Sequence, residues 1–168
     1  MLKGRSRRAR PAGVSAAGAI ASRMAQDLPL TTKAAASLAA WHDMVARKDL
    51  SELPALLHPQ ARFRSPMAHH PYESAQAVAL ILGTGLTVLE DFAYHRQFAT
   101  SDGASAVLEF SARVGERKLK GVDIIQFDAN GLITDFEVMV RPMSGLQALG
   151  AEMGARLATA LPAFKGGA

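Results

Sequence analysis

Asp123 has the residue type and the sequence context that acid–base chemistry requires. It lies in the segment 118–127, where alternate residues share one face of a predicted strand: Gly121, Asp123, Ile125 and Phe127. A carboxyl group among apolar side chains is poorly solvated, which raises its pKa and allows it to donate a hydrogen bond near pH 7. If this face is exposed to solvent instead, Asp123 forms a surface ion pair with a nearby lysine or arginine.

Histidines are the other candidates for proton transfer, because an unperturbed imidazole titrates near neutral pH. His69 and His70 are adjacent in a predicted loop, where either supplies a general base or both are simply solvated. None of the five histidines lies four residues from another, and there is no cysteine. These absences exclude thiolate chemistry, disulfides and the common zinc motifs, so we expect neither a metal nor a cofactor.

The composition is that of one globular domain with a basic tail. Of 168 residues, 49% are hydrophobic and 20% are charged, and no apolar stretch is long enough to span a membrane. Residues 1–26 contain six of the 19 basic side chains and no acidic one, which leaves 13 basic and 15 acidic side chains in the rest of the chain. The positive charge therefore lies outside the expected domain, which argues against binding to nucleic acid.

Three parts of the chain are expected from this distribution. They are a basic disordered tail (1–30), a domain (31–160) and a frayed C-terminal tail (161–168). Two other interpretations of the basic segment are an organelle transit peptide and a coding start placed too early, with Met24 as the true initiator. No apolar core of a secretory signal is visible, so we expect a cytoplasmic protein with no membrane contact.

The pattern of apolar residues changes from a helical to a strand period near residue 89. Helices are expected at 34–48, 49–57 and 74–82, with Gly83 and Gly85 ending the third, and a short strand at 61–65. Strands are then expected at 89–100, 104–114, 118–127 and 132–141, followed by a helix that begins at Ser144.

Tight turns between the last four strands indicate an antiparallel meander. The turn sequences are Asp102-Gly103, Gly115-Glu116 and Asn130-Gly131, which tolerate the positive φ of short hairpins. We predict an α+β fold in which three N-terminal helices and an extra C-terminal helix pack on a curved antiparallel sheet. Alternation places four apolar residues toward the interior of this cone: Leu108, Phe110, Phe136 and Val138.

Three segments within residues 33–142 resemble the nuclear transport factor 2-like superfamily, and ketosteroid isomerase in particular. The segment from Val122 to Ile133 is similar to the isomerase's strand–turn–strand, and Asp123 falls on its oxyanion-hole acid. Ala39 to Asp43 resembles the first-helix segment, with Trp41 in place of the oxyanion-hole tyrosine. Arg64-Ser65-Pro66 resembles the segment of the general base, with Ser65 in place of the acid.

The resemblance implies a cone-shaped fold with an apolar pocket for a small molecule. It implies a cofactor-independent isomerase, dehydratase, hydrolase, cyclase or lyase, with Asp123 as acid or hydrogen-bond donor, the Trp41 N–H as a second donor and His69 or His70 as the base. The pocket would be lined by Trp41, Ser65, Leu108, Phe110, Phe136 and Val138. A serine cannot replace the isomerase's carboxylate base near neutral pH without an activator, which argues against steroid isomerisation.

Two further expectations follow from the resemblance. Because Ser65 stands where the base is expected, a non-catalytic binding protein for a hydrophobic ligand is the alternative to an enzyme. Members of the superfamily often dimerise through the outer face of the sheet, so a homodimer is expected. Val122 and Ile124, on the face of the strand opposite Asp123, would contribute apolar contacts to that interface.

Overall fold

Four long strands form the meander that the hairpin sequences predict, in a computed structural model that describes residues 28–158. The strands are antiparallel neighbours: β3 (Glu90–Ala99), β4 (Ser105–Val114), β5 (Arg117–Phe127) and β6 (Ile133–Arg141). The turn glycines Gly103, Gly115 and Gly131 all have positive φ. Glycine adopts this conformation without the steric cost of a side chain, so the predicted turn chemistry is confirmed.

Two more strands make the sheet mixed, which corrects the prediction of a purely antiparallel sheet. β1 (Leu57–Arg64) lies parallel to β6, and the short β2 (Tyr72–Glu73) pairs antiparallel with β1 at the edge. The order across the sheet is β2-β1-β6-β5-β4-β3. No hairpin joins β1 to β6, because a helix and four strands intervene in the chain, so local turn chemistry could not specify the direction of this pair.

Three α-helices and one 3-10 helix accompany the sheet in the described residues. The α-helices are α2 (Thr32–Arg47), α3 (Ala75–Val88) and α4 (Met143–Leu157). The hydroxyl of Thr31 accepts a hydrogen bond from the amide of Ala34 (3.3 Å), and the hydroxyl of Ser74 accepts one from the amide of Ala77 (3.2 Å). These side chains satisfy amides that have no partner within the first turn of each helix.

The helix boundaries differ from the predictions at three places. The second predicted helix is a 3-10 turn, Leu53–Leu56, and α4 begins at Met143 after Pro142 rather than at Ser144. α3 continues past Gly83 and Gly85 to Val88. Each glycine costs a helix about 1 kcal/mol relative to alanine, and packing of the apolar α3 outweighs that cost.

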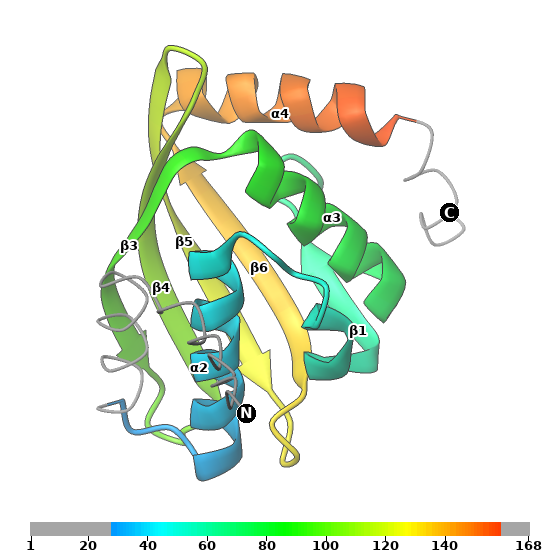
Figure 1. The fold of residues 1–168 in the computed structure, drawn as a ribbon, viewed down its shortest axis with the longest axis vertical. Coiled ribbons are helices and arrows are strands. Elements are labelled where there is room, and N and C mark those ends of the chain that lie inside the picture. The colour runs from blue at the N-terminus through cyan, green and yellow to red at the C-terminus, as the bar shows by residue number, and fades with distance from the viewer. Residues whose placement is uncertain (1–27, 159–168) are drawn as a thin grey trace, which may run out of the picture.

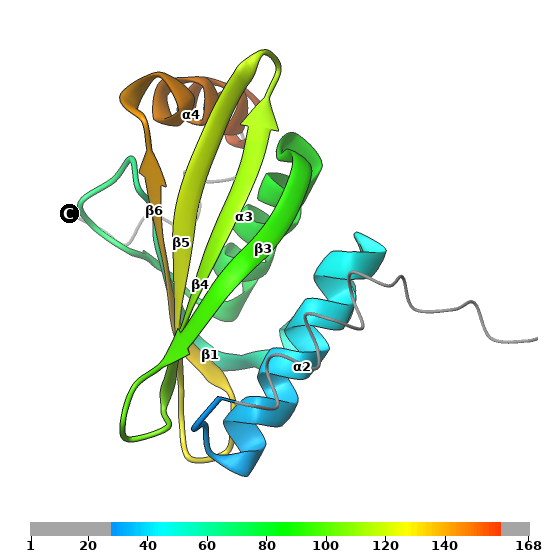
Figure 2. The ribbon, with the colours of Figure 1, turned by 90° about the vertical axis from the view of Figure 1, so that its left-hand side faces the viewer.

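All three α-helices lie on one side of the twisted sheet (Figure 1). The turned view shows α2 and α3 beside the same face, with α4 near the end of β6 (Figure 2). The core lies between these layers and includes Leu38 of α2, Ile125 of β5 and Phe136 of β6. The α+β class is therefore confirmed, and helices and sheet enclose an apolar interior.

The described residues cover most of the predicted domain. Leu28 and Leu30, at the end of the predicted basic tail, pack against the core. The rest of that tail and the predicted frayed segment 161–168 lie outside the described residues. No helix between residues 28 and 158 is long and apolar enough to cross a membrane.

Candidate active site

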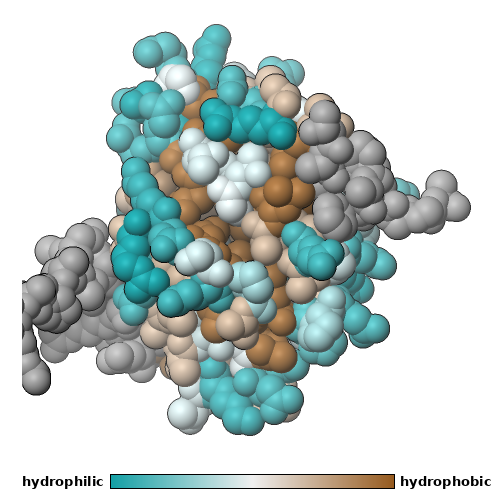
Figure 3. Space-filling view, turned by 45° about the vertical axis from the view of Figure 1, so that its right-hand side comes forward, coloured by the Kyte–Doolittle hydropathy of each residue, from teal (hydrophilic) through white to brown (hydrophobic). Residues whose placement is uncertain are grey.

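A cavity of about 220 Å³ lies between the sheet and the helices. On the side of the molecule that carries α3, apolar surface runs between hydrophilic rims (Figure 3). Most lining residues are aliphatic or aromatic: Trp41, Val45, Leu50, Phe63, Tyr72, Ile81, Leu82, Leu86, Leu89, Phe92, Tyr94, Phe110, Phe136, Val138, Leu149, Met153 and Leu157. Among the described residues that line it, Asp123 is the one carboxylic acid, and no lysine, arginine or histidine takes part.

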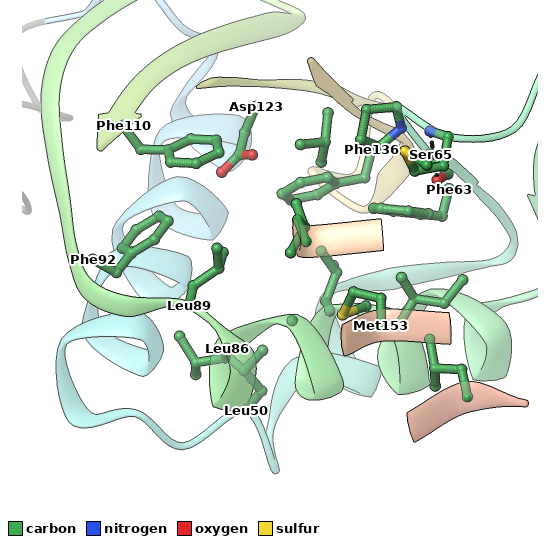
Figure 4. Close-up of a pocket in the computed structure, with 18 of the residues that line it drawn as sticks. Leu50, Phe63, Ser65, Leu86, Leu89, Phe92, Phe110, Asp123, Phe136 and Met153 are labelled. Carbon is green, nitrogen blue, oxygen red and sulfur yellow. Dashed lines mark hydrogen bonds between the residues drawn. The ribbon is translucent and has the colours of Figure 1, made fainter. Parts of the chain in front are cut away.

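Asp123 occupies the middle of the sheet and faces this cavity. On β5 it lies opposite Leu108 of β4 and Val138 of β6, and only 5% of its surface is exposed. Its carboxyl group points into a space bordered by Phe110, Phe92 and Leu89 (Figure 4). The strand alternation therefore places a titratable group within an apolar wall.

A chain of hydrogen bonds from α2 and β3 holds one oxygen of this carboxyl group. The hydroxyl of Tyr94 donates to Asp123 Oδ2 at 2.6 Å. The indole Nε1 of Trp41 donates to the hydroxyl oxygen of Tyr94 at 2.9 Å. In this arrangement the Trp41 donor, expected to face a substrate, is engaged by Tyr94 instead.

Burial raises the pKa of Asp123 from its usual 3.8 to about 7. Loss of hydration is the main cause, because it disfavours the charged form, and the hydrogen bond from Tyr94 opposes it. The pKa of Tyr94 is raised well above its usual value by burial and then by the nearby Asp123 charge. The two groups therefore remain far apart in acidity, and Asp123 is the one that titrates near neutral pH.

Gly121 allows an aromatic ring to lie beside Asp123. It is opposite Phe110 in the sheet, and a Cβ at position 121 would collide with the Phe110 ring and with the carbonyl oxygen of Met139. Phe92 stacks on Phe110 with ring centroids 5.1 Å apart. The missing side chain thus lets two rings exclude water from one flank of the carboxyl group.

Tyr94 was not predicted as a site residue, although its strand carried a signal. Phe92 and Tyr94 are two residues apart, as expected of one strand face, and both line the cavity. The pairing of β3 with β4 shifts between Glu90 and Ala93 and again between Tyr94 and Gln97. These bulges interrupt the alternation along β3, and that obscures which of its residues face inward.

The other predicted site residues divide into two groups. Trp41, Ser65, Phe110, Phe136 and Val138 line the cavity with Asp123. Ser65 lies beyond Phe136 from Asp123 (Figure 4), and its hydroxyl accepts a hydrogen bond from the amide of Met67 at 3.1 Å. Leu108 is fully buried in the core but is not a lining residue.

His69 and His70 do not join the cavity. Both are exposed in the loop after β1, where their rings contact each other with centroids 5.2 Å apart. Neither is among the residues that line the cavity, so the structure does not bring a histidine to Asp123 there. Between residues 28 and 158, no three histidine, aspartate or glutamate side chains gather as potential metal ligands.

Comparison with known proteins agrees with this architecture. The model of the SnoaL-like domain family matches residues 38–136, which is more than half of the chain. The chain belongs to the SnoaL-like domain family. The predicted membership of the nuclear transport factor 2-like superfamily is confirmed by this match and by the solved structures that the fold resembles.

Three solved structures illustrate the similarity. A steroid delta-isomerase from Pseudomonas aeruginosa is 69% identical, with a TM-score of 0.78 over 81% of this chain and 99% of that one. An uncharacterised protein with a cystatin-like fold from Silicibacter pomeroyi is 34% identical, with a TM-score of 0.70 over 77% of this chain and 92% of that one.

The third, an NTF2-like protein of unknown function from Mesorhizobium loti, is 16% identical. It has a TM-score of 0.58 over 66% of this chain and 92% of that one, and it supports the fold alone. None of the curated proteins compared with the chain matches it significantly.

Proposed function

We propose that this protein is a small-molecule enzyme of the isomerase type, in which Asp123 moves a proton within an apolar cavity. The observation that carries the proposal is the state of the Asp123 carboxyl group. One oxygen is held by Tyr94, while the pKa of about 7 keeps both protonation states populated at neutral pH. A group with this pKa serves as base and as acid in one cycle.

A shift of a carbon–carbon double bond suits a single carboxyl group. Ionised Asp123 removes a proton from the carbon between the carbonyl group and the double bond of a β,γ-unsaturated ketone. The resulting dienolate takes the same proton back from Asp123 at the γ carbon, which yields the conjugated ketone and restores the carboxylate. Atoms and charge balance without a cofactor, and throughout the cycle the Tyr94 hydroxyl keeps one oxygen of the Asp123 carboxyl group in place.

The 69% identical steroid delta-isomerase supports this reaction type. In the resemblance to ketosteroid isomerase, the general base falls on Ser65, whose hydroxyl is far too weak a base at neutral pH. The proposal therefore assigns the base to Asp123 rather than to position 65. It requires only that the reacting carbon bind next to Asp123, at the end of the cavity bordered by Phe92 and Phe110 (Figure 4).

A non-catalytic binding protein for a hydrophobic ligand is the second candidate. It is favoured by the lack of a histidine or a second carboxylic acid beside Asp123 among the described lining residues, since His69 and His70 are exposed elsewhere. Reactions that need a separate acid and base, such as many hydrations and eliminations, are poorly served by this cavity. A tightly held apolar molecule that co-purifies with the protein, seen by native mass spectrometry, together with no turnover, would support this alternative.

Turnover of unsaturated ketones tests the proposal. Cyclohex-3-enone and a steroidal β,γ-unsaturated ketone both give conjugated products that absorb in the ultraviolet. Asp123→Asn should lower kcat by about 10²- to 10⁴-fold, because the amide cannot accept and return the proton. The matched control is Glu137→Gln on β6, whose side chain lies on the other face of the sheet from Phe136 and should leave kcat unchanged. Equal rates in wild type and Asp123→Asn would refute the role of Asp123.

A further inference from the structure

A bulge in β3 turns two polar residues toward the same helix. Tyr94 lies opposite Phe110 and Gln97 lies opposite Leu108. A step of three residues along β3 therefore matches a step of two residues along β4, so β3 contains one extra residue. In a regular strand, residues three apart point to opposite faces. Here the extra residue lets both Tyr94 and Gln97 face α2, while His95 contacts Ser111 on the outer face.

His42 fills the space between these two residues. It follows Trp41 on α2 and is 2% exposed. Its Nε2 atom lies 3.2 Å from Oε1 of Gln97. Its ring stands perpendicular to that of Tyr94, with centroids 5.1 Å apart. Consecutive residues of α2 therefore contact Tyr94 in two ways, because Trp41 binds its hydroxyl and His42 packs against its ring.

The buried polar pair His42 and Gln97 does not favour the stability of the fold. The Nδ1 atom of His42 is buried and has no hydrogen-bond partner among the described residues. Burial also lowers the pKa of His42, partly offset by Gln97 and Asp43, so the ring is neutral. A buried polar atom without a partner destabilises a fold, whereas an apolar side chain of similar size at this position would not.

We infer that His42 and Gln97 are positioning residues that hold the Tyr94 ring with its hydroxyl on Asp123. The inference rests on the proposed function. Gln97 fixes His42 through the hydrogen bond, His42 and Phe92 pack perpendicular to the Tyr94 ring, and Tyr94 fixes Oδ2 of Asp123. This arrangement leaves the other carboxyl oxygen free to take the proton. The buried polar pair His42 and Gln97 lowers the stability of the fold, and in return it orients the Tyr94 hydroxyl toward Asp123.

The double variant His42→Leu/Gln97→Leu separates positioning from packing. Removing both polar groups should leave the midpoint of thermal unfolding unchanged or higher. The titration midpoint of the Asp123 carboxyl, followed by 13C NMR in the protein without ligand, should move upward toward that of Tyr94→Phe. The reason is that a looser Tyr94 donates less to the carboxylate, and this hydrogen bond lowers the pKa of Asp123. With an active substrate, kcat should fall about tenfold or more while KM is unchanged.

A polar pair on the opposite face of the same strands supplies the control. His95 Nε2 lies 2.7 Å from the hydroxyl oxygen of Ser111, and both side chains are outside the cavity. His95→Leu/Ser111→Ala should therefore leave the Asp123 titration at its wild-type midpoint. If the His42/Gln97 double variant does not fold, Gln97→Leu alone is measured in the same way.

An unchanged Asp123 midpoint in a folded variant overturns the inference, whether or not the protein is less stable. Because the titration is measured without substrate, this result is independent of the test of the proposed function. Loss of turnover in Asp123→Asn with no effect in the His42/Gln97 variant would uphold the proposed reaction and reject the positioning pair. An upward shift of the Asp123 midpoint in the His42/Gln97 variant, with no turnover by the wild type or any variant, would uphold the positioning pair and reject the proposed reaction.

Discussion

Two buried aspartates on neighbouring strands have opposite electrostatic surroundings. Asp123 on β5 is 5% exposed and Asp135 on β6 is 8% exposed, so burial hardly distinguishes them. Asp135 lies on the outer face, where Arg62 and Arg64 of β1 bind it at 3.2 and 3.0 Å. Asp123 lies on the inner face, where its one hydrogen-bond partner among the described residues is the neutral Tyr94.

The difference shows how one residue type acquires two roles. Two guanidinium groups compensate the charge of Asp135 and connect β1 to β6, the parallel pair of the sheet. No cation approaches Asp123 among the described residues that line the cavity, so loss of hydration dominates and its pKa rises to about 7. The compensated acid connects two strands of the fold, whereas the uncompensated acid is the group to which we assign proton transfer in the proposed function.

The largest expected effect is on the pH dependence of stability. The folded-state pKa of Asp123 is raised from 3.8 to about 7, so its contribution is fully present below about pH 4 and is lost as the pH rises through 7. The free energy of unfolding of the wild type, minus that of Asp123→Asn, should therefore fall by about 4 kcal/mol between pH 4 and pH 8. Urea unfolding at a series of pH values measures this difference.

Taking the difference between wild type and Asp123→Asn removes the contribution of His42, which is also buried and titratable. The pKa of His42 is lowered by burial, so His42 destabilises the fold as the pH drops below 6.5. It is present in both proteins and cancels in the difference. A difference that instead grows as the pH rises from 4 would mean that Asp123 is stabilised as a carboxylate, like a paired surface acid.

A smaller effect on stability is expected from replacing Asp135, because its carboxylate stabilises the fold in the charged form. Asp135→Asn removes the negative charge between Arg62 and Arg64. The side chains of these two arginines are 43% and 38% exposed, so water partly solvates the positive charges that are left without a partner. The variant should lose about 1–3 kcal/mol of unfolding free energy at pH 7, and this loss should shrink in high salt. The NMR titration of Asp123 should stay as in the wild type. A shift of that midpoint would show that the two faces of the sheet are electrostatically coupled.

The smallest effect on the cavity is expected from the apolar part of the outer face. We propose a homodimer through Val122 and Ile124, beside Met139, which lies opposite Val122 and is 50% exposed. Ile124→Glu should shift the mass measured by light scattering at tens of micromolar from dimer to monomer, with the Asp123 titration unchanged. A monomeric wild type under these conditions would remove the dimer proposal.

The candidate site was predictable to the extent that it depends on alternation within single strands. Phe110, Asp123 and Phe136 follow the period of β4, β5 and β6, which pair with little interruption. Tyr94 and Gln97 were not predicted, because the bulges of β3 break that period. His69 and His70 were candidates by residue type and by their place in the loop after the first strand, and neither indicates the direction in which a loop side chain points.

The sequence by itself determined the meander, the turns and which residues of each central strand share a face. These features depend on hairpin glycines and on a period of two, both of which act between neighbours in the chain. Only the tertiary structure decided that β1 lies parallel to β6 and that α3 continues through its glycines. It also decided that Trp41, Tyr94 and Asp123 meet, although 53 residues separate the first two and 29 the last two. Contacts at such separations depend on how elements pack, and packing is a property of the whole core rather than of any local pattern.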